Sequence, residues 1–408
     1  MLDLTDVPVV DHHCHSIVRG HATLDLPGWL GHFTEAAAPA MRHRHAATTL
    51  AFRRTLRLLA AELGVKPAET DGDGDGEALA RAVAEARAAL GDAGLARRLL
   101  GGAGAAAFLI DDGYPTAPHL GDAEFAELSG AATARITRLE PIMERVIPDA
   151  ADPGEARERL LAHLDGLGPE TVGLKSAIAY RTGLAVAAAW DAGEIAASFA
   201  RARRDAAEHD GRLRLAHRAI HEHLLHAALR WAAERGLPVQ FHTGYGDADL
   251  DIRLANPAHL RPLLHDPALA GLRVVLLHGC WPYTREGAFL AAVYEGVWLD
   301  LSYAIPFLSM SEMREMTRAA LAAAPTGKLL YSSDGIGIPD LHWAGAHAAR
   351  RVLADVLAGA VADGDLTRRE AERAAHAILA GNARELYGIG QGSAPVWQSF
   401  PGGRPGAG

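Results

Sequence analysis

Residues 7–15 read Val-Pro-Val-Val-Asp-His-His-Cys-His, and the interpretation of the chain starts from this stretch. The three valines favour a β-strand, and proline is tolerated where a strand begins. Because side chains alternate across a strand, His13 and His15 are predicted to point one way and Cys14 the other. Two imidazoles on one face of a strand end can share a metal ion. A chain with 21 histidines also offers such pairs by chance, so the residues at the other strand ends decide whether this pair belongs to a metal site.

Seven later stretches have the residue types of buried strands. They are residues 105–110, 134–142, 172–177, 239–242, 273–278, 297–303 and 328–334. Helical patterns lie between them, for example at 217–235 and 342–357. With the first strand this makes eight strand–helix units, which predicts the α/β class and a (β/α)₈ TIM barrel, as one domain over residues 1–408. Residues 16–104, with helical runs at 46–63 and 77–100, are predicted to be a helical insertion after the first strand that covers the top of the barrel.

Composition narrows the class of protein. Hydrophobic residues make up 49% of the 408 and charged residues 22%, as in an ordinary globular protein. The net charge of −10 argues against nucleic acid or an anionic membrane surface as the main partner. We see no signal peptide and no apolar run of about 18 residues, and two cysteines make no disulfide framework, which favours the cytoplasm. We therefore expect a small-molecule substrate, and a homo-oligomer is compatible with these properties.

Ligand-type side chains stand at five of the predicted strand ends. They are His13 and His15, Lys175, His242, His278 and Asp334. Active sites of TIM barrels lie at the carboxyl ends of the strands, so these side chains are predicted to meet at one mouth. His217 and His221 are another pair, one helical turn apart, but they precede the fifth strand and we expect them at the solvated surface.

This pattern resembles the amidohydrolase superfamily and, within it, the amidohydrolase-2 group. The resemblance rests on His13-Cys14-His15, His242, His278 and Asp334, and on residues 173–183 and 381–387. The chain also resembles the amidohydrolase domains associated with glutamine-synthetase-like proteins. The likeness covers nearly the whole chain apart from the insertion, and it is specific for the superfamily but not for a substrate. It implies that His13, His15, His242 and Asp334 are the metal ligands.

The expected chemistry follows from such a ligand set. A divalent ion held by neutral imidazoles and a carboxylate lowers the pKa of bound water towards neutrality. Asp334 can also take the proton of the attacking water, and His278 can polarise the substrate carbonyl or stabilise the oxyanion. We predict a metal-dependent hydrolase that cleaves a C–N bond in a small, carboxylate-bearing substrate, with zinc as the expected ion. The alternatives are a metal-dependent decarboxylase of the same group and a non-catalytic barrel that only binds.

Lys175 admits two roles. In some relatives a lysine on the fourth strand is carboxylated and bridges two metal ions. Lys175 can equally hold a substrate carboxylate, with Arg181 as a planar partner six residues further on. We favour substrate binding by Lys175 and Arg181, and hence one divalent ion. Two ions would follow if Lys175 were carboxylated.

Overall fold

The strands of the computed structural model form one parallel barrel. The structure describes residues 2–66, 75–303 and 308–390. Backbone N–H groups of Asp334 and His15 donate to the carbonyls of His13 (3.1 Å) and Gly335 (2.8 Å), so the segment after the last strand pairs with the first. In sheet order the strands are β1 (Val9–Cys14), β2 (Ala105–Asp111), β3 (Ala132–Arg138), β4 (Thr171–Ser176), β5 (Pro238–Phe241), β6 (Arg273–Leu276), β7 (Val297–Asp300) and β8 (Leu329–Leu330). The predicted (β/α)₈ barrel is confirmed.

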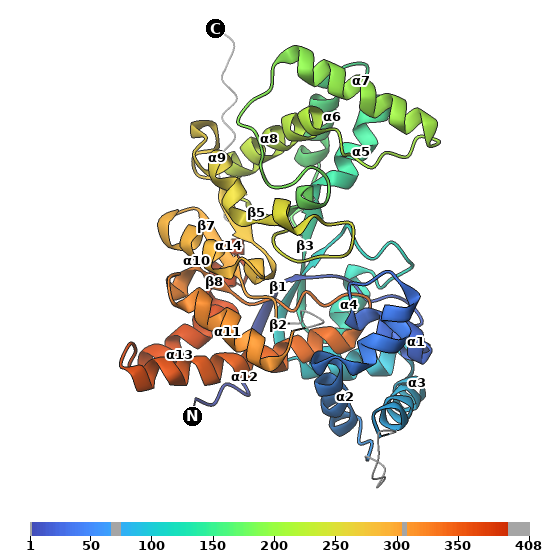
Figure 1. The fold of residues 1–408 in the computed structure, drawn as a ribbon, viewed down its shortest axis with the longest axis vertical. Helices are drawn as coiled ribbons and strands as arrows, with labels where there is room; N and C mark the ends of the chain where they lie inside the picture. The colour runs from blue at the N-terminus through green and yellow to red at the C-terminus, as the bar shows by residue number, and fades with distance from the viewer. Residues whose placement is uncertain (1, 67–74, 304–307, 391–408) are drawn as a thin grey trace.

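Helices surround the barrel (Figure 1). After β2 they are α4 (Asp122–Ser129), α5 (Leu139–Asp149), α6 (Pro153–Asp165), α7 (Ala192–Glu208), α8 (Arg218–Arg235), α9 (Arg261–Leu264), α10 (Thr284–Val293), α11 (Met310–Leu321), α12 (Pro339–Asp363), α13 (Arg368–His376) and α14 (Asn382–Tyr387). The prediction for the third strand was wrong at its end, because residues 139–142 form the first turn of α5. Pro141 suits that turn, because backbone N–H groups in the first turn of a helix have no acceptor within the helix, so a proline there loses no helical hydrogen bond.

The inside of the barrel is filled by apolar side chains and closed by the last helix. Val10, Leu109 and Val275 belong to one buried cluster with Leu386 and Tyr387 of α14. The side-chain amide of Asn382, the first residue of α14, donates to two carbonyls around the start of β8. The helix α14 therefore closes the end of the barrel opposite the predicted site.

The segment between β1 and β2 is helical, with α1 (Leu26–Leu30), α2 (Leu50–Glu62) and α3 (Asp75–Gly102). In Figure 1 these helices (blue) and α5–α8 (green) lie on opposite sides of the barrel. Trp29, Phe33 and Phe52 pack edge to face in a second apolar cluster, which extends to the start of α12. A buried ion pair from Arg87 Nε to Asp340 Oδ1 (3.0 Å) also fastens α3 to α12. The helical runs predicted at 46–63 and 77–100 correspond to α2 and α3.

The two cysteines are buried and free. Cys14 packs in the apolar layer outside the strands, away from His13 and His15, as the alternation of the strand predicts. Cys280 Sγ accepts a hydrogen bond from the Thr243 hydroxyl (3.2 Å). Among the described residues, no helix has both the length and the apolar character needed to cross a membrane.

Candidate metal centre

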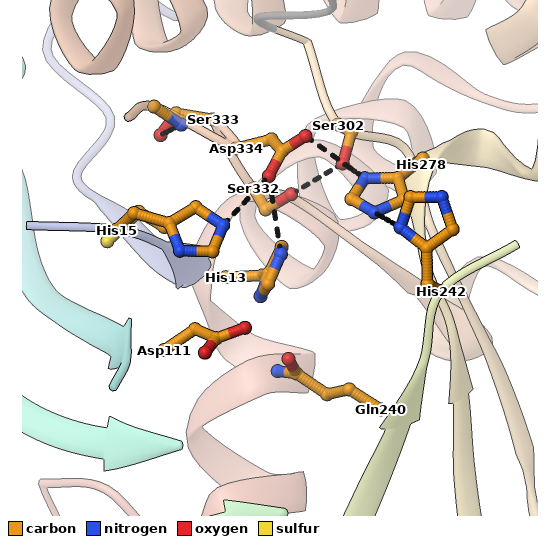
Figure 2. A network of polar contacts seen from close by, with 12 residues as sticks. His13, His15, Asp111, Gln240, His242, His278, Ser302, Ser332, Ser333 and Asp334 are labelled. Atoms are coloured by element: carbon orange, nitrogen blue, oxygen red, sulfur yellow. Dashed lines mark hydrogen bonds and ion pairs between the residues drawn. The ribbon is translucent and has the colours of Figure 1, made fainter. Parts of the chain in front are cut away.

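Asp334 lies among histidines at the mouth of the barrel (Figure 2). Its Oδ1 is 3.3 Å from His13 Nε2 and 3.6 Å from His15 Nε2, and its Oδ2 is 3.2 Å from His278 Nδ1. Both Asp334 (φ 52°) and His278 (φ 63°) have left-handed backbones, which few side chains adopt and which turn the chain sharply after β8 and β6. Such strain persists only where the surrounding structure holds it, and it is commonly found at functional sites.

His242 contacts the group around Asp334 through the ring of His278. Its Nδ1 lies 3.0 Å from His278 Nε2, and its Nε2 donates to the Tyr245 carbonyl (2.8 Å). A carbonyl can only accept, so this bond fixes the tautomer that leaves a lone pair on Nδ1. Burial, together with His278, lowers the pKa of His242 well below its usual value. His242 is therefore a neutral imidazole, the form that binds metals.

Lys175 lies beside His13 at the inner end of the cavity. Its Nζ is 3.3 Å from His13 Nε2 and 3.7 Å from Asp111 Oδ2. Burial lowers the pKa of Lys175 to about 8. Burial and the charge of Lys175 lower the pKa of His13 to about 3, so His13 is neutral as well. Lys175 thus contacts a predicted metal ligand directly.

Arg181 lies in the wall of the same cavity, which has a volume of ≈ 1130 Å³. Its Nη2 is 3.2 Å from Glu144 Oε1. Its Nε is buried and has no hydrogen-bond partner in the part of the chain that the structure describes. Buried donors are nearly always paired, so this N–H is an exception, and a ligand acceptor could reach it only after the side chain moves.

Asp111 and Arg138 are site residues that the sequence interpretation missed. They end β2 and β3, and Arg138 forms a forked pair with Asp111 through Nη2–Oδ2 (2.6 Å) and Nε–Oδ1 (3.1 Å). The rule that found the other residues, polar side chains at strand ends, would have found these two. Tyr245, whose hydroxyl donates to Asp334 Oδ2 (3.1 Å), comes from the loop after β5 and carried no such signal.

His221 is buried, so the expected surface position was wrong. Its Nε2 lies 3.6 Å from Glu140 Oε1, which accepts hydrogen bonds from the Ser176 hydroxyl (2.7 Å) and the Ala177 amide (2.9 Å). The helix α8 that carries His221 is covered by α5, α6 and α7, so it has little solvated face. Half-buried His217 precedes α8.

The segment between β1 and β2 adds an acid to the cavity. Glu35 and His32 line the same cavity as His13 and Asp334. No hydrogen bond or ion pair links the Glu35 side chain to the described residues. Burial raises the pKa of Glu35 to about 7, with smaller contributions from the negative charges of Asp334 and Asp247.

Glu35→Gln is expected to stabilise the metal-free protein above pH 7 and to leave it nearly unchanged near pH 4.5. The folded protein holds the Glu35 proton more tightly than the unfolded chain, whose carboxyl titrates near 4.5. Ionisation of Glu35 therefore lowers the free energy of unfolding as pH rises above about 4.5. The loss is complete above about pH 7, where it reaches about 3 kcal/mol. Melting temperatures of both proteins, measured from pH 4.5 to 8.5 after chelation, test this. Parallel curves would contradict it.

Two overlapping groups offer ligand atoms for a cation. Those of His13, His278 and Asp334 lie within 4.8 Å of one another, as do those of His13, His15 and Asp111. Imidazole nitrogens and carboxylate oxygens suit zinc and similar divalent ions. Asp111 is already paired with Arg138 and Lys175, so the group around Asp334 has the freer carboxylate. Its residues fit a divalent ion.

Comparison with known proteins agrees with this geometry. Residues 10–389 match the family model Amidohydro_2, described as Amidohydrolase. Protein fluG from Emericella nidulans is 29% identical over an alignment 414 residues long, which covers 94% of this chain and 46% of fluG, so the chain spans about half the length of that curated relative. A protein from Lactobacillus casei, whose crystal structure is described as that of a proposed metal-dependent hydrolase, is 28% identical with a TM-score of 0.77, covering 95% of this chain and 98% of that one. Uronate isomerase from Thermotoga maritima shares the fold, at 13% identity and a TM-score of 0.66, with 94% and 95% covered. The predicted resemblance is confirmed, and the chain belongs to the amidohydrolase family of metal-dependent enzymes.

Proposed function

We propose that this enzyme hydrolyses a C–N bond in a small, carboxylate-bearing substrate and uses one divalent ion. Zinc is the ion that we expect. The observation that carries the proposal is the contact of one carboxylate, Asp334, with His13, His15 and His278 at the mouth of the barrel. When bound there, such an ion supplies a Lewis acid and lowers the pKa of water. We assign His13, His15, His242 and Asp334 as its ligands.

In this proposal Asp334 moves the proton. Burial alone would raise the pKa of Asp334, but His278, His13 and His15 hold it well below its usual range. Asp334 is therefore ionised and can accept a proton from the attacking water at a carboxylate oxygen and return it to the leaving nitrogen. The Tyr245 hydroxyl, which donates to Oδ2, keeps the carboxylate oriented. His278, beside Oδ2, is assigned to polarise the substrate carbonyl.

We further propose that Arg181 and Lys175 bind the substrate carboxylate. Arg181→Ala is expected to raise KM for the acid about ten- to a hundredfold, the value of one charged hydrogen bond of about 1.5–3 kcal/mol. KM for the corresponding neutral amide should change little. Steady-state kinetics with the acid and the amide measure this difference, and an equal rise for both would contradict the assignment.

Two further variants complete that test. Arg214→Ala is the matched control, because Arg214 also lines the cavity but pairs with exposed Asp249 at 3.3 Å. We expect its KM to stay within about twofold, as for a surface ion pair. Lys175→Ala should raise KM for the acid and keep the metal. Loss of metal would instead make Lys175 a ligand and favour two ions.

Product analysis tests the reaction itself. The purified metal-loaded enzyme is incubated with N-acyl amino acids and with side-chain amides of dicarboxylic amino acids, and the released amine (ammonia from the side-chain amides) and carbon dioxide are both measured. Amine release that depends on Asp334 supports the hydrolase. Carbon dioxide without amine would replace it with a decarboxylase, and ligand binding with neither product would favour the non-catalytic barrel.

A further inference from the structure

A buried column of polar side chains runs beneath the metal centre, from the last helix to the end of β7. The Tyr387 hydroxyl of α14 lies 3.2 Å from His12 Nδ1, and His12 Nε2 lies 3.1 Å from Asp300 Oδ1. Gln240 Nε2 donates to the Tyr387 hydroxyl (2.9 Å) and to the His12 carbonyl (2.8 Å). His12, Asp300 and Gln240 have no exposed surface. The column ends on a carboxylate directly below the metal centre.

Asp300 uses both carboxylate oxygens on neighbouring strand ends. Oδ2 accepts the backbone N–H of His278 (2.9 Å) and the hydroxyl of Ser302, and Oδ1 accepts the backbone N–H of Ser302 (3.0 Å). Ser302 Oγ in turn lies 3.4 Å from His278 Nδ1 (Figure 2). One carboxylate thus contacts the backbone of His278 directly and its ring through Ser302.

The backbone of His278 needs such support. His278 (φ 63°) and Ser302 (φ 37°) both adopt left-handed conformations that side chains with a Cβ rarely take. Hydrogen bonds from Asp300 hold both residues in place. Without them His278 is free to relax, and its ring would leave the position between His242 Nδ1 (3.0 Å) and Asp334 Oδ2 (3.2 Å).

We propose that Asp300 is a positioning residue, which acts through His278 and Ser302 to set the imidazole of His278 for the hydrolysis. The inference rests on the proposed function for its kinetic consequence. A buried carboxylate is a poor choice for stability alone, since well-packed apolar groups commonly do as well. Here the oxygens of Asp300 accept hydrogen bonds from the backbone of His278, a site residue, and from Ser302, which lies next to the His278 ring. The ring of His12, itself in contact with Tyr387, holds the carboxylate from below.

Asp300→Asn tests the proposal. Asparagine keeps one acceptor oxygen and places an NH₂ group opposite donors, so it cannot accept the backbone N–H groups of both His278 and Ser302, which bond to different oxygens of Asp300. We expect kcat to fall about ten- to a hundredfold with KM within about twofold. The zinc dissociation constant of the metal-free protein should rise about tenfold or more, since the ring of His278 lies against two of the assigned ligands, His242 and Asp334. Unchanged kcat and zinc affinity would overturn the proposal.

A double-mutant cycle separates positioning from general damage. In a His278→Ala background, Asp300→Asn should change kcat and the zinc dissociation constant by less than about twofold, because the residue through which it acts is gone. An equal effect in both backgrounds would overturn the inference. If no hydrolase activity is found, coupling in zinc affinity alone still supports the inference while the proposed function fails. Hydrolase activity without coupling would support the proposed function and overturn the inference about Asp300.

Two variants guard against a folding artefact. Asp340→Asn removes another fully buried carboxylate, the partner of Arg87, and should lower the melting temperature while keeping kcat and zinc affinity. If Asp300→Asn does not fold, Ser302→Ala replaces it, since it removes only the hydroxyl between Asp300 and the His278 ring. We expect a loss of a few-fold in kcat, about the value of one neutral hydrogen bond, that disappears in the His278→Ala background. Unchanged kcat and zinc affinity in Ser302→Ala would overturn the proposal.

Discussion

Asp334→Asn is expected to lower kcat by about a thousandfold while the protein stays folded. The amide can neither accept the proton of the attacking water nor neutralise a cation among His13, His15 and His278. The fold should persist, because asparagine tolerates the left-handed backbone that position 334 adopts. Single-turnover rates, together with circular dichroism and the melting temperature, test both parts.

The control for Asp334→Asn is Asp355→Asn. Asp355 forms a half-exposed ion pair with Arg314 (2.7 Å) between α11 and α12, and neither residue lines the cavity. Removing that charge should leave kcat within about twofold. If folded Asp334→Asn turned over at a near-normal rate, Asp334 would be neither ligand nor proton acceptor.

Removing the metal is expected to abolish turnover reversibly. The neutral imidazoles of His13 and His242 and the ionised carboxylate of Asp334 are in the states that ligands need, so a divalent ion should bind strongly near neutral pH. After chelation we expect less than about 1% of the activity, which about one equivalent of zinc per chain restores. Elemental analysis and titration of the metal-free protein supply both measurements.

Other results would change the model of the site. A metal-free protein with full activity would remove the ion from the mechanism. Two equivalents per chain, lost together in Lys175→Ala, would favour a carboxylated Lys175 that bridges two ions. Protection against heat should accompany binding, because a ligand that binds only the folded chain stabilises it.

Local rules were sufficient for the barrel and for predicting that most of the candidate site residues meet at one end of it. His13, His15 and His242 lie at or next to a strand end, whereas His278 lies two residues and Asp334 four residues beyond one. Strand alternation and the polarity of the barrel together predicted that these side chains meet at one mouth. Lengths were harder to predict. β8 has two residues where seven were expected, because the chain turns towards the site before it reaches Asp334.

Other features depend on packing that no short pattern reveals. Tyr245 and Glu35 reach the cavity from segments whose paths are set by tertiary contacts. His221 looked solvated because its helix was expected to face water, whereas α5, α6 and α7 cover it. Asp300 ends an apolar strand like the other site residues, but its partners are the backbone N–H of His278, just after β6, and the ring of His12 in β1, and sequence spacing shows neither.

The contact between His12 and Tyr387 spans 375 positions of the chain. A ribosome that synthesises this protein therefore releases β1 long before the helix that closes the barrel beneath it. Until α14 emerges, His12 lacks its lower partner, and Asp334 joins His13 only after eight-tenths of the chain has been made. Contacts of such long range form late in folding, since the intervening chain must be ordered first. With the proposed ligand set, an ion can therefore bind only after residue 334 has been synthesised and has folded against His13, so the ion acquired would reflect what the surroundings supply at that moment.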